Sequence, residues 1–328
     1  MKALRTVSVL LALSYFSCSK PIAPHPQQLF REFWEYVDKN YIFFEAKKVD
    51  WSEVYIRYSR QITANTTEQE LFDSMDAALY ELKDGHNRLV RPNKVGRSFE
   101  ITEGYDVHFD ATVVKKHYVR DSLRQSGNLY WGMLKSGQGY IYLPQFSNYS
   151  AFGSVLKKLK ELGAKSVVID VRNNLGGDSN AVPQLLGILV KQKTYLGAYI
   201  EKNGPNHKDI TVPMGIYAAP HSGFYLDTPV IVLINRSSYS ATSYFAAMIK
   251  GLPNVKLIGQ TTGGGAGGNL AYQLSNGWIV TVSVSDFIDK EGHSIEEGVE
   301  PDLYINNTAE GLVEGHDAML ECAMGQRF

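Results

Sequence analysis

Apolar side chains in the first third of the chain recur every three or four residues. The stretches 27–41, 51–58 and 68–82 each place them along one face of a helix. Such a face is stable only when it is buried against a neighbour. The pattern therefore predicts a small helical domain over residues 27–90.

The third of these helices carries its own start and stop signals. Thr67 and Glu70 have the spacing of a capping box, in which each side chain accepts a hydrogen bond from the backbone amide of the other residue. We expect the helix to end at Gly85, because glycine suits the left-handed conformation found at helix ends. His86 is then expected on a loop just past the helix.

The pattern changes after residue 90. Short alternating runs at 112–114, 118–119 and 140–143 indicate strands. Residues 91–130 are accordingly predicted to form a β-rich connection between the helical domain and the rest of the chain.

From residue 131 onwards, strands and helices are expected to alternate. Continuous apolar runs, typical of strands buried on both faces, lie at residues 166–170, 229–234 and 255–259. Helical patterns lie at residues 152–162, 181–190 and 241–250. A hairpin is expected at 270–284, turning at Ser275-Asn276-Gly277. The alternation predicts an α/β core with a mainly parallel sheet over residues 131–328.

The first 26 residues have the pattern of an export signal. Lys2 and Arg5 precede the apolar run 7–16, which is too short to span a bilayer. A small residue before Cys18 resembles the end of a bacterial lipoprotein signal, and an ordinary secretory signal cut nearby is the alternative. We expect residues 1–18 to be the signal, with Cys18 acylated, and 19–26 to be a linker. The protein would then be exported and lipid-anchored at the bacterial cell envelope, on its periplasmic or outer-membrane face.

Composition narrows the classes of function. The formal net charge is -1 and no dense Lys/Arg run occurs, so nothing favours nucleic acid. The chain has no Cys-x-x-Cys or His-Glu-x-x-His spacing, and we expect no metal. Glycines 263, 265 and 268 formally match Gly-x-Gly-x-x-Gly, but a strand pattern follows where a dinucleotide site needs a helix. We therefore expect no cofactor.

Candidate chemistry lies where two predicted strands end. Gly176 and Gly177 follow the strand that ends at Asp170, and their backbone amides, unshielded by side chains, could bind an oxyanion. Residues 235–243 contain four serines between a buried strand and a helix. A helix N-terminus stabilises negative charge on a nucleophile, but a serine there is often only a cap, and these patterns do not rank the four. Of the eight histidines, His86 has the most suitable loop position for a base.

Together these segments resemble the tail-specific, or C-terminal-processing, serine peptidases and their tricorn-type relatives. The resemblance is carried, in order, by Leu82–His86, Gly139–Ile141, Asp170–Gly177, Ser238–Ser243, Gly259–Gly263 and Gly298–Asp302. It implies a crotonase-like α/β fold and the nucleophile Ser240, the middle serine of the family's Ser-x-Ser-Ala run. It also implies an oxyanion hole formed by the Ala241 amide and a glycine of the Gly176-Gly177 pair.

Two features depart from this family. Many members use a lysine base just past the glycine-threonine turn, but Gly265 stands at that position, and Lys250 is about 15 Å along the helix from Ser240. Lys256 is an equally poor substitute. The resemblance to the tricorn-type branch implies a Ser-His-Glu arrangement instead. His86 would be the base, with His293 as the fallback, and Glu296 or Glu297 would orient it. The chain is also too short between His86 and residue 130 for the family's peptide-binding PDZ module.

The sequence thus predicts an exported serine peptidase that hydrolyses peptide or protein substrates through Ser240 and His86. A catalytically inactive, peptide-binding lipoprotein on the same fold is the alternative, motivated by the missing lysine. An acyl-CoA enzyme on a related fold is disfavoured because no basic cluster is available for the phosphates.

Overall fold

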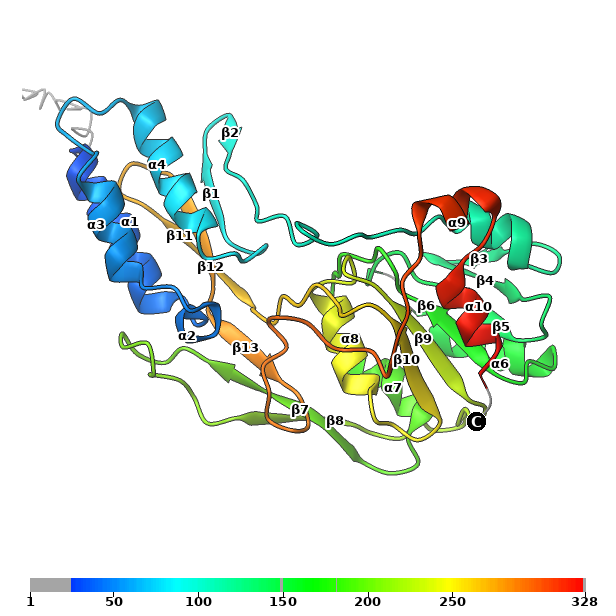
Figure 1. Cartoon of the computed structure of the whole chain (residues 1–328). Helices are drawn as coiled ribbons and strands as arrows, with labels where there is room; N and C mark the ends of the chain where they lie inside the picture. Colours follow the sequence, from blue (N-terminus) through cyan, green and yellow to red (C-terminus); the bar gives the residue numbers. More distant parts are fainter. Residues whose placement is uncertain (1–24, 148–149, 181, 327–328) are drawn as a thin grey trace, which may run out of the picture.

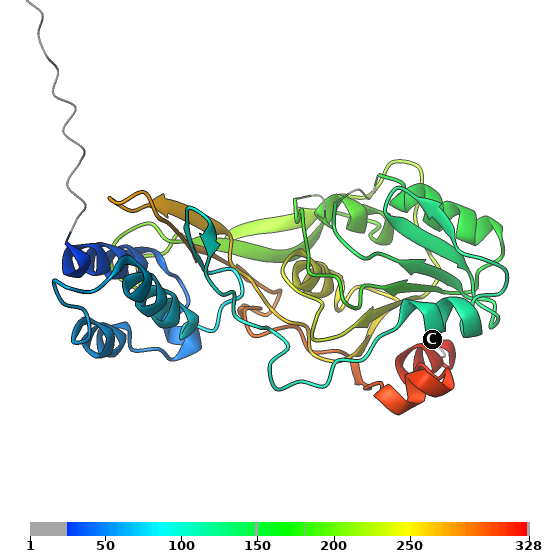
Figure 2. The ribbon, with the colours of Figure 1, turned by 90° about the horizontal axis from the view of Figure 1, so that it is seen from above.

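The computed structural model describes residues 25–147, 150–180 and 182–326 (Figures 1 and 2). The expected signal at 1–18, Cys18 included, and most of the expected linker at 19–26 lie outside these residues. Among the described residues, none of the helices combines the length and the apolar character that crossing a bilayer requires.

Four helices open the described chain, and strands and helices alternate after them. The helices are α1 (Pro26–Asn40), α2 (Phe44–Lys47), α3 (Trp51–Ser59), α4 (Glu68–Tyr80), α5 (Ala111–Val113), the π-helix η1 (Val114–Tyr118), α6 (Phe152–Glu161), α7 (Val182–Leu186), the 3-10 helix η2 (Gly187–Leu189), α8 (Ala241–Ile249), α9 (Ala309–Glu314) and α10 (Ala318–Met324). The strands are β1 (Arg88–Arg91), β2 (Lys94–Val95), β3 (Arg124–Ser126), β4 (Leu129–Met133), β5 (Gly139–Tyr142), β6 (Val167–Asp170), β7 (Thr194–Glu201), β8 (Met214–Ala218), β9 (Val230–Ile234), β10 (Val255–Gly259), β11 (Asn269–Gln273), β12 (Ile279–Ser283), β13 (Ser285–Ile288) and β14 (Leu303–Tyr304).

The first four helices and the sheet β11-β12-β1-β2 form one unit, the N-terminal lobe (Figure 1). Helix α1 buries Leu29, Phe30, Phe33 and Val37 on its inner face. Each such side chain contributes about 1.5–3 kcal/mol when fully buried. The predicted capping box is present at the start of α4, where Thr67 and Glu70 bond reciprocally. The amphipathic pattern therefore gave these helices correctly.

The sheet of this lobe joins distant parts of the chain. Strands β11 and β12 form the predicted hairpin, with Asn269 opposite Ser283. The other edge of β12 pairs with β1, so that Arg88 lies opposite Thr281. The loop that carries His86 leads directly into β1. Its position is consequently fixed by a strand that lies almost two hundred residues later in the chain.

A seven-stranded sheet in the order β14-β10-β9-β6-β5-β4-β3 forms the core. Strands β14, β10, β9, β6 and β5 are parallel, and β4 and β3 are antiparallel to their neighbours. Helices α6 and α8 cover one face, and η1 and α10 cover the other. The predicted α/β fold with a mainly parallel sheet and an N-terminal helical region is confirmed. A smaller antiparallel sheet, β13-β7-β8, extends from the core towards the N-terminal lobe (Figure 1).

The strands expected at 112–114 and 118–119 are wrong. This segment forms α5 and η1 instead. The Asp110 side chain accepts a hydrogen bond from the Thr112 amide and so caps a helical turn. Val113, Val114 and Tyr118 then pack onto the core sheet from one side. Three alternating residues were too short a run to distinguish a strand from this turn.

Candidate active site

Ser240 lies on a sharp turn between β9 and α8. Its backbone has φ 56° and ψ -123°, which a residue with a Cβ atom adopts only under strain. The turn is held by the Ser240 amide, which donates to the Gly264 carbonyl oxygen over 2.8 Å. Although Ser240 occupies the cap position of α8, its hydroxyl makes no capping hydrogen bond. The geometry presents this hydroxyl at a helix N-terminus, where negative charge is stabilised.

Two of the neighbouring serines, Ser238 and Ser243, have structural partners. Ser238 is buried, and its hydroxyl donates to the Val171 carbonyl oxygen over 2.9 Å. Ser243 is also buried and donates to the Thr262 hydroxyl over 2.9 Å. These bonds tie the serine run to the strands beside it. Ser240, in contrast, is the serine whose hydroxyl faces a histidine.

His86 lies against this hydroxyl, and its Nε2 is 3.1 Å from Ser240 Oγ. Burial lowers the pKa of His86, the Asp84 charge partly raises it again, and Arg88 lowers it. The net lowering favours the neutral imidazole that a general base needs. His86 Nδ1 is buried and has no hydrogen-bond partner within the described residues.

Gly85 does not adopt the left-handed conformation expected of it. Lys83 takes that conformation instead, with φ 50°. A Cβ atom on residue 85 would lie 2.9 Å from the Tyr239 hydroxyl and 3.0 Å from Ile101. Glycine is therefore required here because the backbone passes so close to Tyr239, whose ring packs beside the His86 imidazole with the two centroids 4.9 Å apart.

The glycine pair lies directly against the serine turn. Gly176 and Gly177 have φ values of 104° and 136°, and a Cβ atom on Gly176 would lie 2.8 Å from Ser240 Cβ. The Gly176 amide already donates to Asn174 Oδ1 over 2.9 Å. Among the described residues, the amides of Gly177 and Ala241 donate to no other group. These two amides are thus the ones available for an oxyanion.

A buried ion triplet fixes the strand that precedes the glycines. Arg172 is fully buried and pairs with Asp170 at 2.6 Å and with Asp317 at 2.8 Å. The Tyr140 hydroxyl also donates to Asp170 over 2.8 Å. The triplet links the end of β6 to the start of α10. These contacts hold the first residues of the Asp170–Gly177 loop in place beside the Ser240 turn.

The structure does not bring Glu296 or Glu297 into hydrogen-bond contact with His86. Glu296 is buried, and its carboxylate accepts from the Ala266 amide over 2.9 Å and pairs with Lys47 Nζ at 2.9 Å. Glu297 is exposed and pairs with the same Lys47 Nζ at 2.7 Å. Both predicted acids are therefore engaged by a lysine of the N-terminal lobe, which no local motif could reveal.

The other bases considered lie elsewhere. The His293 side chain is 78% exposed and faces Asp289. Lys250 Nζ donates to the Glu300 carbonyl oxygen over 2.8 Å. At the position of the family's lysine, a Cβ atom on Gly265 would lie 2.5 Å from the Tyr239 ring. Tyr239 thus occupies the space that a lysine side chain would need.

Two charged residues of the site were missed by the sequence reasoning. They are Lys47 and Asp84, and Asp84 is 3% exposed beside His86. The position of Asp84 two residues before the histidine was the available signal. Among the described residues, Asp289, Glu291 and His293 form the single three-residue group with metal-ligand spacing, and two of the three are exposed. This group lies apart from the contacts of Ser240 and His86 described above.

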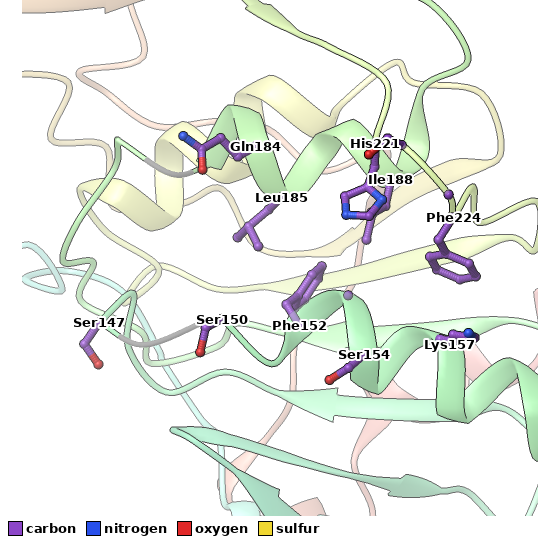
Figure 3. A pocket seen from close by; sticks show the side chains of 13 residues that line it. Ser147, Ser150, Phe152, Ser154, Lys157, Gln184, Leu185, Ile188, His221 and Phe224 are labelled. Atoms are coloured by element: carbon purple, nitrogen blue, oxygen red, sulfur yellow. The ribbon is translucent and has the colours of Figure 1, made fainter.

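A cavity of about 710 Å³ opens next to Ser147 and Ser150 (Figure 3). It lies between α6 and α7, and Phe152, Leu185, Ile188 and Phe224 supply its apolar lining. Ser147 lies at its edge (Figure 3). The preceding residue, Phe146, donates its amide to the Gly176 carbonyl oxygen over 2.9 Å. The backbone of Phe146 and Ser147 therefore runs from the glycine pair to the edge of the cavity.

The Lys47–Glu296 pair predicts a pH-dependent loss of stability. Burial and the Asp84 charge raise the pKa of Glu296 to about 8, although Lys47 opposes the rise. Burial lowers the pKa of Lys47, but the two glutamates more than offset this and leave it raised. Because the pKa of Glu296 is raised on folding, its contribution to stability falls as pH rises through about 8.

Replacing Lys47 by methionine should therefore raise the pKa of Glu296 further and cost up to about 3–5 kcal/mol at pH 9, where the buried carboxyl must either stay protonated or ionise without a cation. At pH 5 the loss should be much smaller, because Glu296 takes up a proton. Urea unfolding at both pH values measures the difference. Lys39→Met is the matched control, since Lys39 and Glu35 are exposed and 3.9 Å apart and their pair contributes at most about 1 kcal/mol. Equal losses at the two pH values would contradict the prediction.

Comparison with known proteins agrees with this geometry. The description "Peptidase family S41" matches residues 137–305, more than half of the 328 residues, and "Tricorn protease C1 domain" matches residues 23–79. A carboxyl-terminal-processing protease of Synechocystis sp. is 27% identical over 167 residues, covering 50% of this chain and 37% of that protein. Carboxy-terminal processing protease CtpB of Bacillus subtilis is 27% identical over 171 residues, covering 51% and 34%. The match thus spans about a third of each curated relative.

A solved structure extends the similarity to nearly the whole chain. The crystal structure of a protein from Parabacteroides merdae superposes with a TM-score of 0.86 and 32% sequence identity. The superposition covers 92% of this chain and 96% of that one. The N-terminal lobe is therefore shared as well as the core. The chain belongs to peptidase family S41.

Proposed function

We propose that the protein is a serine peptidase that hydrolyses peptide bonds with Ser240 as nucleophile and His86 as general base. The observation that carries the proposal is the 3.1 Å contact between His86 Nε2 and Ser240 Oγ. It occurs at a strained strand-to-helix turn, beside two amides available for an oxyanion. Family membership and the printed names of the relatives support the same class of reaction.

The reaction follows from these positions. Ser240 Oγ attacks the carbonyl carbon of the scissile bond while its proton passes to His86 Nε2. The Gly177 and Ala241 amides hold the negative oxygen of the tetrahedral intermediate. His86 then gives the proton to the amine nitrogen, the C–N bond breaks, and an acyl ester remains on Ser240. A water molecule attacks the ester, again giving its proton to His86, and Ser240 is regained as the acid product leaves.

The cavity of Figure 3 suits the peptide substrate of this reaction. Its edge at Ser147 follows Phe146, whose amide is bonded to the Gly176 carbonyl oxygen beside the Ser240 turn, so an extended substrate would run from Ser240 towards it. Phe152, Leu185, Ile188 and Phe224 would surround an apolar side chain there. The relatives' names point to carboxyl-terminal segments of proteins as the substrate class.

The proposed place of action is outside the cytoplasm. The charged and apolar pattern before Cys18 supports export and a lipid anchor at the cell envelope. The globular part would then face water while the acyl chains hold it at a membrane.

A fluorophosphonate probe tests the function directly. We expect the parent protein to be labelled covalently on Ser240 and, without the probe, to cleave quenched fluorescent peptides and an unfolded protein. Ser240→Ala should abolish labelling, and His86→Ala should slow both reactions by about 10³-fold or more. Labelling that persists in Ser240→Ala would refute the nucleophile. Peptide binding by the parent without labelling or turnover would instead support the inactive, peptide-binding alternative.

A further inference from the structure

Asp84 holds the loop on which His86 lies. One carboxylate oxygen accepts a hydrogen bond from the His86 amide over 2.8 Å, and the other accepts from the Ser283 hydroxyl over 2.8 Å. Ser283 belongs to β12, so these bonds tie the histidine loop to the sheet of the N-terminal lobe. Within the described residues, no cation pairs with Asp84. Its negative charge is therefore not neutralised by a neighbour.

Glu296 is in the opposite situation. Lys47 lies 2.9 Å from its carboxylate, and the Ala266 amide uses the second oxygen. Burial raises the pKa of Glu296 to about 8, so below that pH the group is mostly neutral and exerts little field on a third group. Consistent with this, Asp84 is the carboxylate whose charge raises the pKa of His86 against the larger lowering caused by burial.

We propose that Asp84, rather than Glu296 or Glu297, is the positioning residue of His86. Through the backbone amide it fixes the loop, and through its unpaired charge it stabilises the imidazolium that forms when Ser240 loses its proton. A buried carboxylate performs this role in serine hydrolases generally by favouring the charged form of the histidine. The inference rests on the proposed function, because it assigns a partner to the proposed base.

Other titratable groups near Asp84 and His86 could also shift the pKa of His86, so a test must separate their effects from that of Asp84. Charged or titratable side chains that face Asp84 or His86 are Tyr41 after α1, Arg88 of β1, Tyr239 before α8 and Glu296 after β13. Lys47 of α2 pairs with Glu296. Burial raises the pKa of both tyrosines well above 10, so they stay neutral between pH 5 and pH 9. Glu296 is the other group that titrates near His86 in this range. A glutamine at position 296 therefore provides the necessary comparison.

The direct test is an NMR titration of His86 in protein labelled with ¹⁵N-histidine. Ser240→Ala serves as the common background, so that no hydrolysis is needed. Adding Asp84→Asn should lower the pKa of His86 by about one pH unit or more, because a stabilising charge is lost. Adding Glu296→Gln should leave it almost unchanged. The opposite pattern, a large change with Glu296→Gln and none with Asp84→Asn, would overturn the proposal.

Turnover provides a second readout, with Ser240 intact. Asp84→Asn should reduce kcat by about 10²–10⁴-fold and move the acid limb of the kcat/KM profile to lower pH. Ser283→Ala is the matched control, because it removes a hydrogen bond to Asp84 but keeps the charge. It should reduce kcat less than about tenfold and leave the acid limb in place.

These outcomes separate the inference from the proposed function. If Asp84→Asn fails to fold, Glu296→Gln and Ser283→Ala still test the idea, since a shifted acid limb in either variant would contradict it. An unlabelled and inactive parent would refute the peptidase proposal. The NMR titration would in that case still decide whether Asp84 or Glu296 acts on His86.

Discussion

Replacing Ser240 by glycine is expected to abolish hydrolysis and to give a more stable protein than replacing it by alanine. Both changes remove the proposed nucleophile, and kcat should fall by about 10⁴–10⁶-fold in each. They differ in the backbone. At φ 56° and ψ -123° a Cβ atom is strained at a cost of about 1–3 kcal/mol, whereas glycine adopts this conformation freely. The entropy of glycine in the unfolded chain offsets about 0.5–1 kcal/mol of the gain.

We therefore expect the glycine variant to exceed the alanine variant in stability by about 1 kcal/mol. Urea unfolding of the two variants measures the difference, and both lack the bond to His86, so that contribution cancels. Equal stabilities would show that the serine turn stores no strain. The expected result would mean that the backbone conformation that presents the Ser240 hydroxyl lowers the stability of the folded protein, as is common at reactive positions of enzymes.

Replacing Arg172 by methionine is expected to destabilise the protein by about 3–5 kcal/mol. The guanidinium is fully buried between Asp170 and Asp317, and its removal leaves two carboxylates without a cation in the core. The Phe109 ring, 4.3 Å from the guanidinium carbon, would also lose its contact. Because this loss is a large part of the stability of an ordinary domain, partial unfolding at 37 °C is expected.

Denaturant unfolding and peptidase activity together check this prediction. Activity should fall even under conditions that keep Arg172→Met folded, since the triplet holds the strand that leads to Gly177. Arg120→Met is the matched control, because Arg120 and Asp121 are both exposed and their pair contributes at most about 1 kcal/mol. A loss below about 1 kcal/mol in Arg172→Met would contradict the view that the triplet is a desolvated unit.

The main elements of the fold could be read from the sequence because their signals are local. The buried runs of β6, β9 and β10 and the capping box of α4 depend on residues that are close together in the chain. Pairing between β1 and β12 could not be read in the same way. Nothing in Arg88–Arg91 indicates that its partner is Ile279–Ser283, because the residues of a strand do not specify which distant strand will pair with it.

The same distinction between local and long-range signals applies to the candidate site. The motif order singled out Ser240 and His86, and the structure places the two side chains in contact. The choice of the acid remained open because it depends on tertiary neighbours. Lys47 lies about 250 positions before Glu296 in the chain, yet their contact determines what Glu296 can do. Likewise, the lysine position is closed by Tyr239, whose ring could not be placed from Gly265 alone.

The shared sheet of the N-terminal lobe also sets the order of events during synthesis. Strands β1 and β2 alone form a two-stranded ribbon, which is only marginally stable in water. Their lasting partner, β12, begins only at residue 279, long after β1 and β2 have been made. Until then the His86 loop has no fixed position, because the strand that pairs with β1 is not yet present. A growing chain therefore carries Ser240 before the strand that positions His86 has been made, so the two side chains can come into contact only after β12 has joined β1.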